Sequence, residues 1–273
     1  MIWHNNWVWH NLDERSTNKN VDFKFGLTPY SFKITSFKEA CYSTAKTIYD
    51  KHKKVYVALS GGMDSLYVTK VFHEMKIPFV PVIISSEANT EETKYAFDYC
   101  IDQNIPHHVI TTTGKHLLEY YYKEIYPKTY SIGINGSASV IAAQYAKENG
   151  GIILCGEYLM DVEHDNITCS DYDFYRDIMV GENINFFYYT PQIAYAMAKE
   201  SEVPFEHTKY KLYQFETNRE KIKYQYSRPI SNVVKNFNVF LSNQKCEYTL
   251  MSRPDFLTMM EQYAIWLLQF RER

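Results

Sequence analysis

The sequence lacks the features that mark a membrane-spanning or disulfide-linked protein. No apolar run in its 273 residues approaches the roughly 20 residues that a transmembrane helix needs. The five cysteines include no CxxC pair and no regular spacing, which favours reduced thiols over a disulfide framework. The first residues show neither the basic nor the apolar segment of a signal peptide. We therefore expect a soluble, cytoplasmic protein with no membrane partner.

Other absences exclude particular binding chemistries. The net charge of -3 provides no general attraction to nucleic acid. The nine histidines form no HExxH motif and no pairing with cysteine at zinc spacing. The GxxxxGK[ST] pattern of the Walker A loop is also missing. A nucleic-acid interface would therefore need a local basic patch, and a phosphate site would need a different loop.

Strand and helix patterns alternate through the middle of the chain. Short apolar runs, clearest at 55–59 and 152–155, are separated by stretches with helical periodicity. This alternation predicts βαβ units and an α/β fold with a doubly wound parallel sheet. We expect three parts, which are an N-terminal β addition (1–35), an α/β core (36–180) and a helical C-terminal extension (181–273).

Two helix starts carry the pattern of a capping box. Ser36 is followed three residues later by Glu39, and Asn89 is followed at the same spacing by Glu92. We therefore expect helices to begin at these two positions. The polar, acidic stretch 161–177 predicts a loop.

A glycine-containing loop joins the apolar run 55–59 to a helical pattern, and it reads Ser60-Gly61-Gly62-Met63-Asp64-Ser65. Its two glycines permit backbone conformations and close approaches that a Cβ would prevent. Backbone N–H groups at the start of the following helix, together with the hydroxyls of Ser60 and Ser65, would bind an anion such as phosphate. Asp64 in an anion site indicates a bound cation, most simply Mg²⁺.

This loop resembles the PP-loop of the N-type ATP pyrophosphatases, also called the adenine nucleotide α-hydrolase-like superfamily, and the order of elements is similar over residues 37–160. The superfamily includes asparagine, GMP and NAD synthetases and several tRNA-modifying enzymes. The resemblance implies ATP and Mg²⁺ as cofactors and cleavage of ATP between the α- and β-phosphates. It further implies that a carboxylate or amide-type oxygen of a small molecule is adenylated and then attacked by ammonia or another amine. We therefore expect an AMP-forming ligase, closest in layout to the asparagine-synthase-like branch.

The same resemblance assigns residues to the nucleotide site. Asp64 is expected to act in catalysis and to bind the metal, with Asp161 as a second metal ligand. The stretch from Gly156 to Asp161 departs from the Gly-Glu-Gly-x-Asp-Glu type of sequence in that branch, because the second glycine is missing and the acid is displaced by one. The expected nucleotide-binding residues are Ser60, Gly61, Gly62, Met63, Asp64, Ser65, Ile84, Ser85, Gly156 and Glu157.

Members of this superfamily usually provide a lysine or arginine to the phosphates from later in the chain. The basic, aromatic segment 209–235 contains such residues, and Lys209 and Arg228 are the catalytic candidates that we take from it. A helix is expected to start at Thr190-Pro191, and another at 253–270. The basic segment also leaves tRNA open as a partner.

Three alternatives to the ligase remain at this stage. The protein could modify tRNA by thiolation or lysidine formation, with the basic segment contacting RNA. It could be an enzyme resembling PAPS reductase, although Met63 stands where that family commonly has lysine, and Cys246 is its one candidate for the reactive cysteine. It could also bind a nucleotide without catalysis. A homo-oligomer is left open.

Overall fold

The computed structural model describes residues 1–18, 20–28, 36–87, 89–130, 136–157, 161–163, 166–168, 174–193 and 196. The predicted basic segment at 209–235 and the predicted helix at 253–270 lie outside these residues. In the described part, no helix is long and apolar enough to cross a membrane. The cysteines of this part, Cys41, Cys100 and Cys155, are buried thiols.

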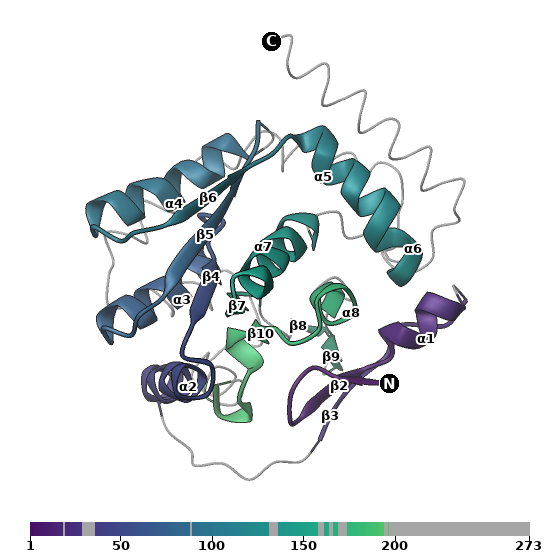
Figure 1. Ribbon diagram of the computed structural model, residues 1–273. Coiled ribbons are helices and arrows are strands. Elements are labelled where there is room, and N and C mark those ends of the chain that lie inside the picture. The colour runs from purple at the N-terminus through teal and green to yellow at the C-terminus, as the bar shows by residue number, and fades with distance from the viewer. Residues whose placement is uncertain are drawn as a thin grey trace.

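A five-stranded sheet forms the centre of the described structure (Figure 1). Every neighbouring pair of strands is parallel, which confirms the predicted α/β fold with a parallel sheet. The edge strand β10 is not indicated by the sequence, because two residues are too few for a periodicity. In spatial order the strands are β10 (Ile184–Asn185), β7 (Ile152–Cys155), β4 (Val55–Ala58), β5 (Val80–Ser85) and β6 (His108–Thr111).

Helices cover both faces of the sheet, so the sheet is doubly wound as predicted. Side chains of β4 alternate between the two faces: Val55 and Val57 enter one core, and Tyr56 enters the other. The first core is shared with α2 (Phe37–His52), α3 (Met63–Glu74) and α4 (Thr90–Asp102). The second is shared with α5 (Gly114–Tyr120), the π-helix η1 (Tyr121–Ile125), α6 (Tyr126–Thr129), α7 (Gly136–Glu148) and α8 (Tyr175–Met179).

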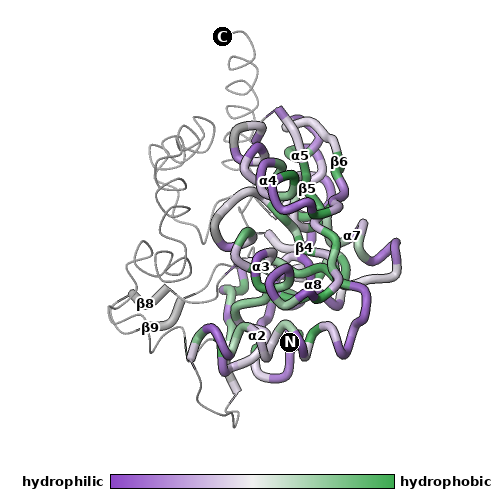
Figure 2. Tube along the Cα trace, turned by 90° about the vertical axis from the view of Figure 1, so that its left-hand side faces the viewer, coloured by the Kyte–Doolittle hydropathy of each residue, from purple (hydrophilic) through white to green (hydrophobic). Residues whose placement is uncertain are grey.

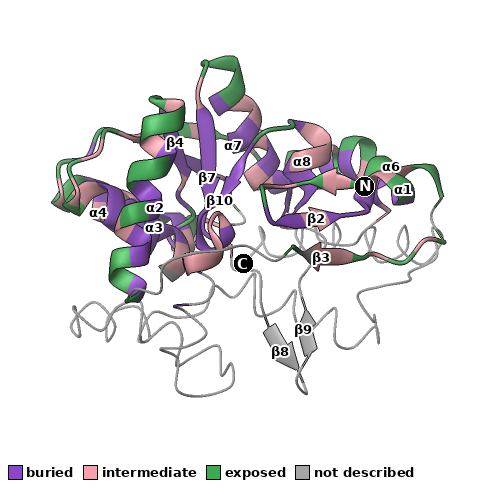
Figure 3. Cartoon of the chain, turned by 90° about the horizontal axis from the view of Figure 1, so that it is seen from below, coloured by how far each residue is buried: buried purple, intermediate pink, exposed green. Residues whose placement is uncertain are grey.

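Burial follows this layered arrangement. Buried residues occupy the strands and the sheet-facing sides of the helices, while the outer side of α2 is exposed (Figure 3). Hydrophobic residues run through the central strands, and hydrophilic residues gather on the outer segments (Figure 2). The four residues of β7 are all buried, as expected for a strand covered on both faces.

The N-terminal segment forms a separate antiparallel sheet, which confirms the strands expected there. Its strands are β1 (Ile2–Trp3), β2 (Val8–His10) and β3 (Phe25–Leu27), with the helix α1 (Leu12–Thr17) inserted between the last two. The helix α1 has six residues, which are too few to show a helical period, so the sequence does not indicate this helix. The indole Nε1 of Trp7 donates to the carbonyl oxygen of Tyr188 at 3.1 Å, which ties this sheet to the segment after β10.

The helix starts predicted within the described residues are confirmed, but one of the two predicted capping boxes is wrong. Ser36 and Glu39 form the expected capping box at α2. Asn89 is the N-cap residue of α4, yet its side chain makes no capping bond to that helix and turns back to the end of β5. At Thr190 the hydroxyl accepts from the N–H of Ile193 at 3.4 Å, and residues 191–193 are helical as predicted.

The loop predicted at 161–177 is also wrong in part. The structure has a short antiparallel pair there, β8 (Asp161–Glu163) and β9 (Asn166–Thr168), followed by α8. The 3-10 helix η3 (Phe186–Tyr188) then follows β10 directly. The acidic composition suggested solvent exposure, but Arg176 and the carboxyl group of Asp177 are buried and paired.

Candidate functional site

The strand order places a crevice at the carboxyl ends of β4 and β7. From β4 the chain proceeds to β5 and β6 on one side of the sheet and then returns to β7 on the other side of β4. In open α/β sheets, ligands bind where the order reverses in this way, because the loops on the two sides diverge. The Ser60–Ser65 loop follows β4, and Gly156 follows β7, so both predicted segments meet at this point.

A cavity of about 270 Å³ opens at the crevice. This is close to the lower end of the range of roughly 300–1,000 Å³ typical of small-molecule sites. Its walls are apolar near β5 and α7 and polar near the loop. The lining residues are Ala58, Leu59, Ser60, Gly62, Asp64, Ser65, Val82, Ile84, Asn89, Ala138, Ser139, Ala142, Cys155, Gly156 and Glu157.

The hydroxyls of Ser60 and Ser65 hold the loop closed. Their Oγ atoms lie 3.1 Å apart, and the Ser65 hydroxyl donates to the carbonyl oxygen of Gly62 at 3.1 Å. The backbone N–H of Ser60 donates to Ser65 Oγ, and that of Gly62 donates to Ser60 Oγ, both at 3.2 Å. Both hydroxyls therefore form hydrogen bonds inside the loop, where they fix its shape, and their predicted contact with a phosphate stays a prediction.

The two glycines serve different needs. Gly61 has a φ of 87°, and a Cβ there would lie 2.0 Å from the carbonyl oxygen of Glu92 in α4, so only glycine fits. Gly62 lines the cavity and is the N-cap residue of α3. Because α3 begins at Met63, Asp64 stands in its first turn, where the partial positive charge of the helix end favours an acidic side chain or a bound anion.

Gly156 has a packing role that the sequence did not indicate. A Cβ at this position would lie 2.8 Å from the carbonyl carbon of Asp64 and 2.8 Å from the backbone nitrogen of Ser65. The space beside Gly156 is therefore filled by the loop backbone. The absence of a Cβ thus admits the start of α3, and Gly156 also lines the cavity, so its predicted contact with a nucleotide stays a prediction.

The end of β5 is held by Asn89. The Asn89 amide Nδ2 donates to the carbonyl oxygen of Ile84 at 2.9 Å, and its Oδ1 accepts from the backbone N–H of Ser86 at 2.8 Å. The carbonyl oxygen of Ser85 accepts from the N–H of Thr112 at 2.8 Å. A base bound at Ile84 would therefore share a carbonyl that already accepts one bond, which is possible because a carbonyl oxygen has two lone pairs.

Glu157 is fixed by a buried arginine. Arg176 donates from Nη1 to Glu157 Oε1 at 3.0 Å and from Nη2 to Oε2 at 2.7 Å, which is the bidentate geometry of a strong ion pair. The Arg176 side chain is fully buried, whereas that of Glu157 keeps 27% of its surface exposed. Asn185 and Ser139 complete the arrangement by contacting Glu157 and Arg176 respectively. Arg176 was not predicted as a site residue, because its partner is 19 residues away in the chain.

Most of the predicted nucleotide-binding residues line the cavity: Ser60, Gly62, Asp64, Ser65, Ile84, Gly156 and Glu157. Gly61 and Ser85 do not line it, and the side chain of Met63 is not among those described. Asp161 lies in β8, and its side chain is not among those described. Lys209 and Arg228 lie outside the described residues. Asn89, Ser139 and Arg176 are additional residues at or beside the cavity that the sequence analysis missed.

The donor atoms fit Mg²⁺ bound together with phosphates. In the part of the chain that is described, no group of three or more His, Cys, Asp or Glu side chains could hold a metal. Asp64 and the two serine hydroxyls provide oxygen atoms only, and Mg²⁺ is commonly held by one or two carboxylates with water and substrate phosphates. The residues present therefore suit a cation that arrives with a nucleotide.

Comparison with known proteins found distant matches among solved structures alone. No protein-family model and no curated protein sequence matches the chain. Among solved structures, an NH3-dependent NAD synthetase from Campylobacter jejuni is 14% identical, with 84% of this chain and 93% of that chain covered and a TM-score of 0.41. An NMN synthetase from Francisella tularensis is 13% identical, with 69% and 96% covered and a TM-score of 0.37. A predicted subunit of a tRNA methyltransferase from Methanocaldococcus jannaschii is 13% identical, with 65% and 94% covered and a TM-score of 0.35.

These TM-scores all lie below 0.5, so the description of the fold rests on the strand order, and that of the candidate site on the loop after β4 and the cavity.

Proposed function

We propose that this protein binds Mg²⁺ and ATP at the carboxyl ends of β4 and β7 and cleaves ATP to AMP and pyrophosphate. The observation that carries the proposal is the Ser60–Ser65 loop, which joins a central parallel strand to a helix start and borders the cavity at the strand-order reversal. A helix start at such a position is a site for phosphate groups. The proposed product is an adenylated carboxylate or amide, which ammonia or another amine then attacks.

The cavity's two ends support a nucleotide as the occupant. Val82, Ile84 and Ala142 give an apolar wall that suits the face of a base, and Asp64 lies on the polar side with the loop. Adenine is planar and apolar on its faces, whereas the triphosphate is charged. The arrangement therefore favours a nucleotide with its phosphates toward α3.

The proposed reaction proceeds in two displacements. The substrate oxygen attacks the α-phosphorus, the bond from that phosphorus to the bridging oxygen breaks, and pyrophosphate leaves. The amine then attacks the activated carbon, and AMP leaves. The loop and the first turn of α3 would stabilise negative charge on the departing pyrophosphate. Mg²⁺ supplies charge neutralisation on the phosphates when it is bound, with Asp64 as its proposed ligand.

Further groups are proposed to act from beyond the described residues. A lysine or arginine such as Lys209 or Arg228 would complete the charge balance on the phosphates. Asp161 is retained as a proposed second metal ligand on the strength of the sequence alone.

Product analysis tests the proposal. The protein is incubated with radiolabelled ATP, Mg²⁺ and a pool of small carboxylates and amides, and the nucleotide products are separated. We expect AMP and pyrophosphate, and addition of hydroxylamine as the amine should trap activated carboxylates as hydroxamates. Accumulation of ADP would refute the cleavage position. A parallel incubation in which total tRNA replaces the pool distinguishes a tRNA-modifying enzyme from a small-molecule ligase.

A matched pair of variants identifies the loop as the source of the activity. Asp64→Asn should reduce AMP formation at least a hundredfold, because it removes the proposed metal ligand. Asp50→Asn removes a carboxylate of the same size from the exposed side of α2 and should leave the rate unchanged. Equal rates for the two variants would locate the activity elsewhere.

A further inference from the structure

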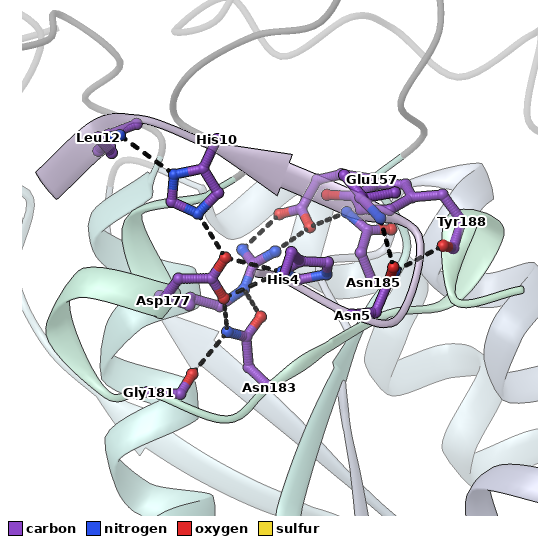
Figure 4. A network of polar contacts seen from close by, with 12 residues as sticks. His4, Asn5, His10, Leu12, Glu157, Asp177, Gly181, Asn183, Asn185 and Tyr188 are labelled. Carbon is purple, nitrogen blue, oxygen red and sulfur yellow. Dashed lines mark hydrogen bonds and ion pairs between the residues drawn. The ribbon is translucent and has the colours of Figure 1, made fainter. Parts of the chain in front are cut away.

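Two histidines of the N-terminal segment contact one buried carboxylate. His4 follows β1, and His10 is the last residue of β2. His4 Nδ1 lies 2.8 Å and His10 Nε2 lies 2.9 Å from Oδ2 of Asp177 (Figure 4). The side chains of His4 and His10 are 1% and 0% exposed, and that of Asp177 is 6% exposed. Residues more than 160 positions apart in the chain are thus joined in the interior.

The hydrogen bonds define which ring nitrogens donate. Nδ1 of His10 accepts from the backbone N–H of Leu12 at 3.2 Å, so its proton is on Nε2, which donates to Asp177. On His4 the nitrogen Nε2 is buried and has no partner among the described residues, which suits a ring that carries its proton on Nδ1. Both histidines are therefore donors to the same carboxylate.

Asp177 continues this chain of contacts to the cavity. Its Oδ1 accepts from Nδ2 of Asn183, whose Oδ1 in turn accepts from Arg176 Nε at 3.2 Å. Arg176 then holds Glu157 in the bidentate pair described above. In Figure 4, Glu157 lies at one end of the network and His10 at the other. We call this series, from His4 and His10 through Asp177, Asn183 and Arg176 to Glu157, the polar relay.

Glu157 lines the cavity and can still accept a hydrogen bond. Of its two oxygens, Oε2 accepts from Arg176 and Asn185, whereas Oε1 accepts one bond, from Arg176, among the described residues. A carboxylate offers about four acceptor positions. The direction of the remaining position is set by Arg176, because the fork of its guanidinium fixes the plane of the carboxylate.

We propose that the N-terminal sheet positions Glu157 for the nucleotide through the polar relay, with His4 and His10 as positioning residues. The inference rests on the proposed function, because it names Glu157 as a contact of the bound nucleotide. Each group in the relay is buried or half-buried and has a defined partner. Removal of one donor at the far end therefore leaves a buried acceptor that must find another partner, and the neighbouring side chains shift.

Two substitutions at His10 separate positioning from folding. His10→Leu fills a similar space and removes the donor, and we expect it to weaken Mg·ATP binding about tenfold by isothermal titration calorimetry. His10→Gln restores an amide donor near the position of Nε2, and we expect its dissociation constant to stay within about twofold of the unaltered protein. Val8→Ala is the control, because Val8 is a buried apolar residue of the same strand that contributes no group to the relay. It should lower the melting temperature and leave the affinity unchanged.

The outcomes distinguish this inference from the proposed function. If the unaltered protein does not bind Mg·ATP, the proposed function fails and the inference falls with it. If the unaltered protein binds and His10→Leu binds equally well, the inference alone is overturned. A loss in Val8→Ala equal to that in His10→Leu would also overturn it, because the sheet would then act through stability and not through the relay.

A measurement on the unaltered protein covers the case in which His10→Leu does not fold. Coupling through the relay acts in both directions, so a nucleotide bound at Glu157 should also perturb the surroundings of the two histidines. We expect Mg·ATP to shift the imidazole ¹⁵N resonances of His4 and His10 and to leave those of His73, at the far end of α3, in place. Unchanged resonances of His4 and His10 at saturating nucleotide would overturn the inference.

Discussion

The backbones of Gly156 and Asp64 are in such close contact that no further atom fits between them. A Cβ on Gly156 would lie 2.8 Å from the Asp64 carbonyl carbon and 3.0 Å from its oxygen. The end of β7 therefore supports the first turn of α3 directly. The two sides of the crevice are built as one unit, and the position of Asp64 depends on a residue 92 positions later, the difference between 156 and 64.

The first prediction follows from this contact. Gly156→Ala should displace the backbone at Asp64 and Ser65, because the colliding atoms are main-chain atoms that cannot rotate away. We expect a loss of about 1–3 kcal/mol in the free energy of unfolding, the usual cost of overpacking. We also expect Mg·ATP binding to weaken by at least tenfold, measured by calorimetry.

The control for this prediction is Gly150→Ala. Gly150 has a φ of 67° and open space around its Cβ position, so alanine costs about 1 kcal/mol of backbone strain there without touching the loop. Stability should fall in both variants and nucleotide affinity in Gly156→Ala alone. Equal affinities would show that the contact with Asp64 has no effect on the site.

Local sequence patterns were sufficient to predict the parallel sheet, apart from β10, and the loop. The run ending in Leu59 and the helical spacing after it are continuous in the chain, so β4, the loop and α3 could be placed without tertiary information. The Ser36 capping box was equally local, because its two bonds lie within four residues.

Competing side-chain contacts, local at Asn89 and long-range at Asp177, determined what the sequence could not show. Asparagine is a residue type that often caps helices through its side chain. The side chain of Asn89 instead donates to the carbonyl oxygen of Ile84 and accepts from the N–H of Ser86. Asp177 belongs to a polar stretch and would be exposed by composition. It is buried because His4 and His10 reach it from the other end of the chain.

The second prediction concerns the buried pair of Arg176 and Glu157. Arg176→Met removes the cation and leaves a carboxylate without its main partner, which should cost about 3–5 kcal/mol in the free energy of unfolding. The double variant with Glu157→Gln should be less destabilised than Arg176→Met alone, because the remaining charge is gone. Urea denaturation of the two single variants and the double variant gives the coupling energy. If the losses in the free energy of unfolding of the two single variants add up to the loss in the double variant, Arg176 and Glu157 do not interact directly.

The third prediction concerns Ala138, a small residue of α7 at the cavity. Ala138 lines the cavity and is half-buried, so Ala138→Phe should place a ring in the apolar end of the cavity. Nucleotide affinity should fall about a hundredfold or more, while the melting temperature changes little. Gln144→Phe is the control, since it puts the same ring on the same helix in a separate pocket beside Tyr120. Normal binding by Ala138→Phe would place the nucleotide outside this cavity.

The fourth prediction concerns acid stability and depends on Asp177. Burial alone would raise the pKa of the Asp177 carboxyl, but the nearby His4 and the hydrogen bonds from His10 and His4 outweigh it and hold the pKa well below the ordinary value of 3.8. A carboxyl with a lowered pKa in the folded state stabilises that state fully above its unfolded pKa. This stabilisation is lost as the pH falls from the ordinary value toward the lower folded-state value. The Asp177→Asn variant lacks this carboxyl. At pH 7 its free energy of unfolding should be about 3 kcal/mol lower than that of the unaltered protein.

The difference between the two proteins should stay constant between pH 7 and pH 5 and shrink below about pH 4, where unfolded chains protonate aspartate. Urea denaturation at several pH values measures it, and comparison of the two proteins cancels the titration of the other carboxylates. A difference that grows on acidification would mean that the folded protein binds the proton at Asp177 more readily than the unfolded chain does. The carboxyl would then be held by burial and not by its two histidine donors.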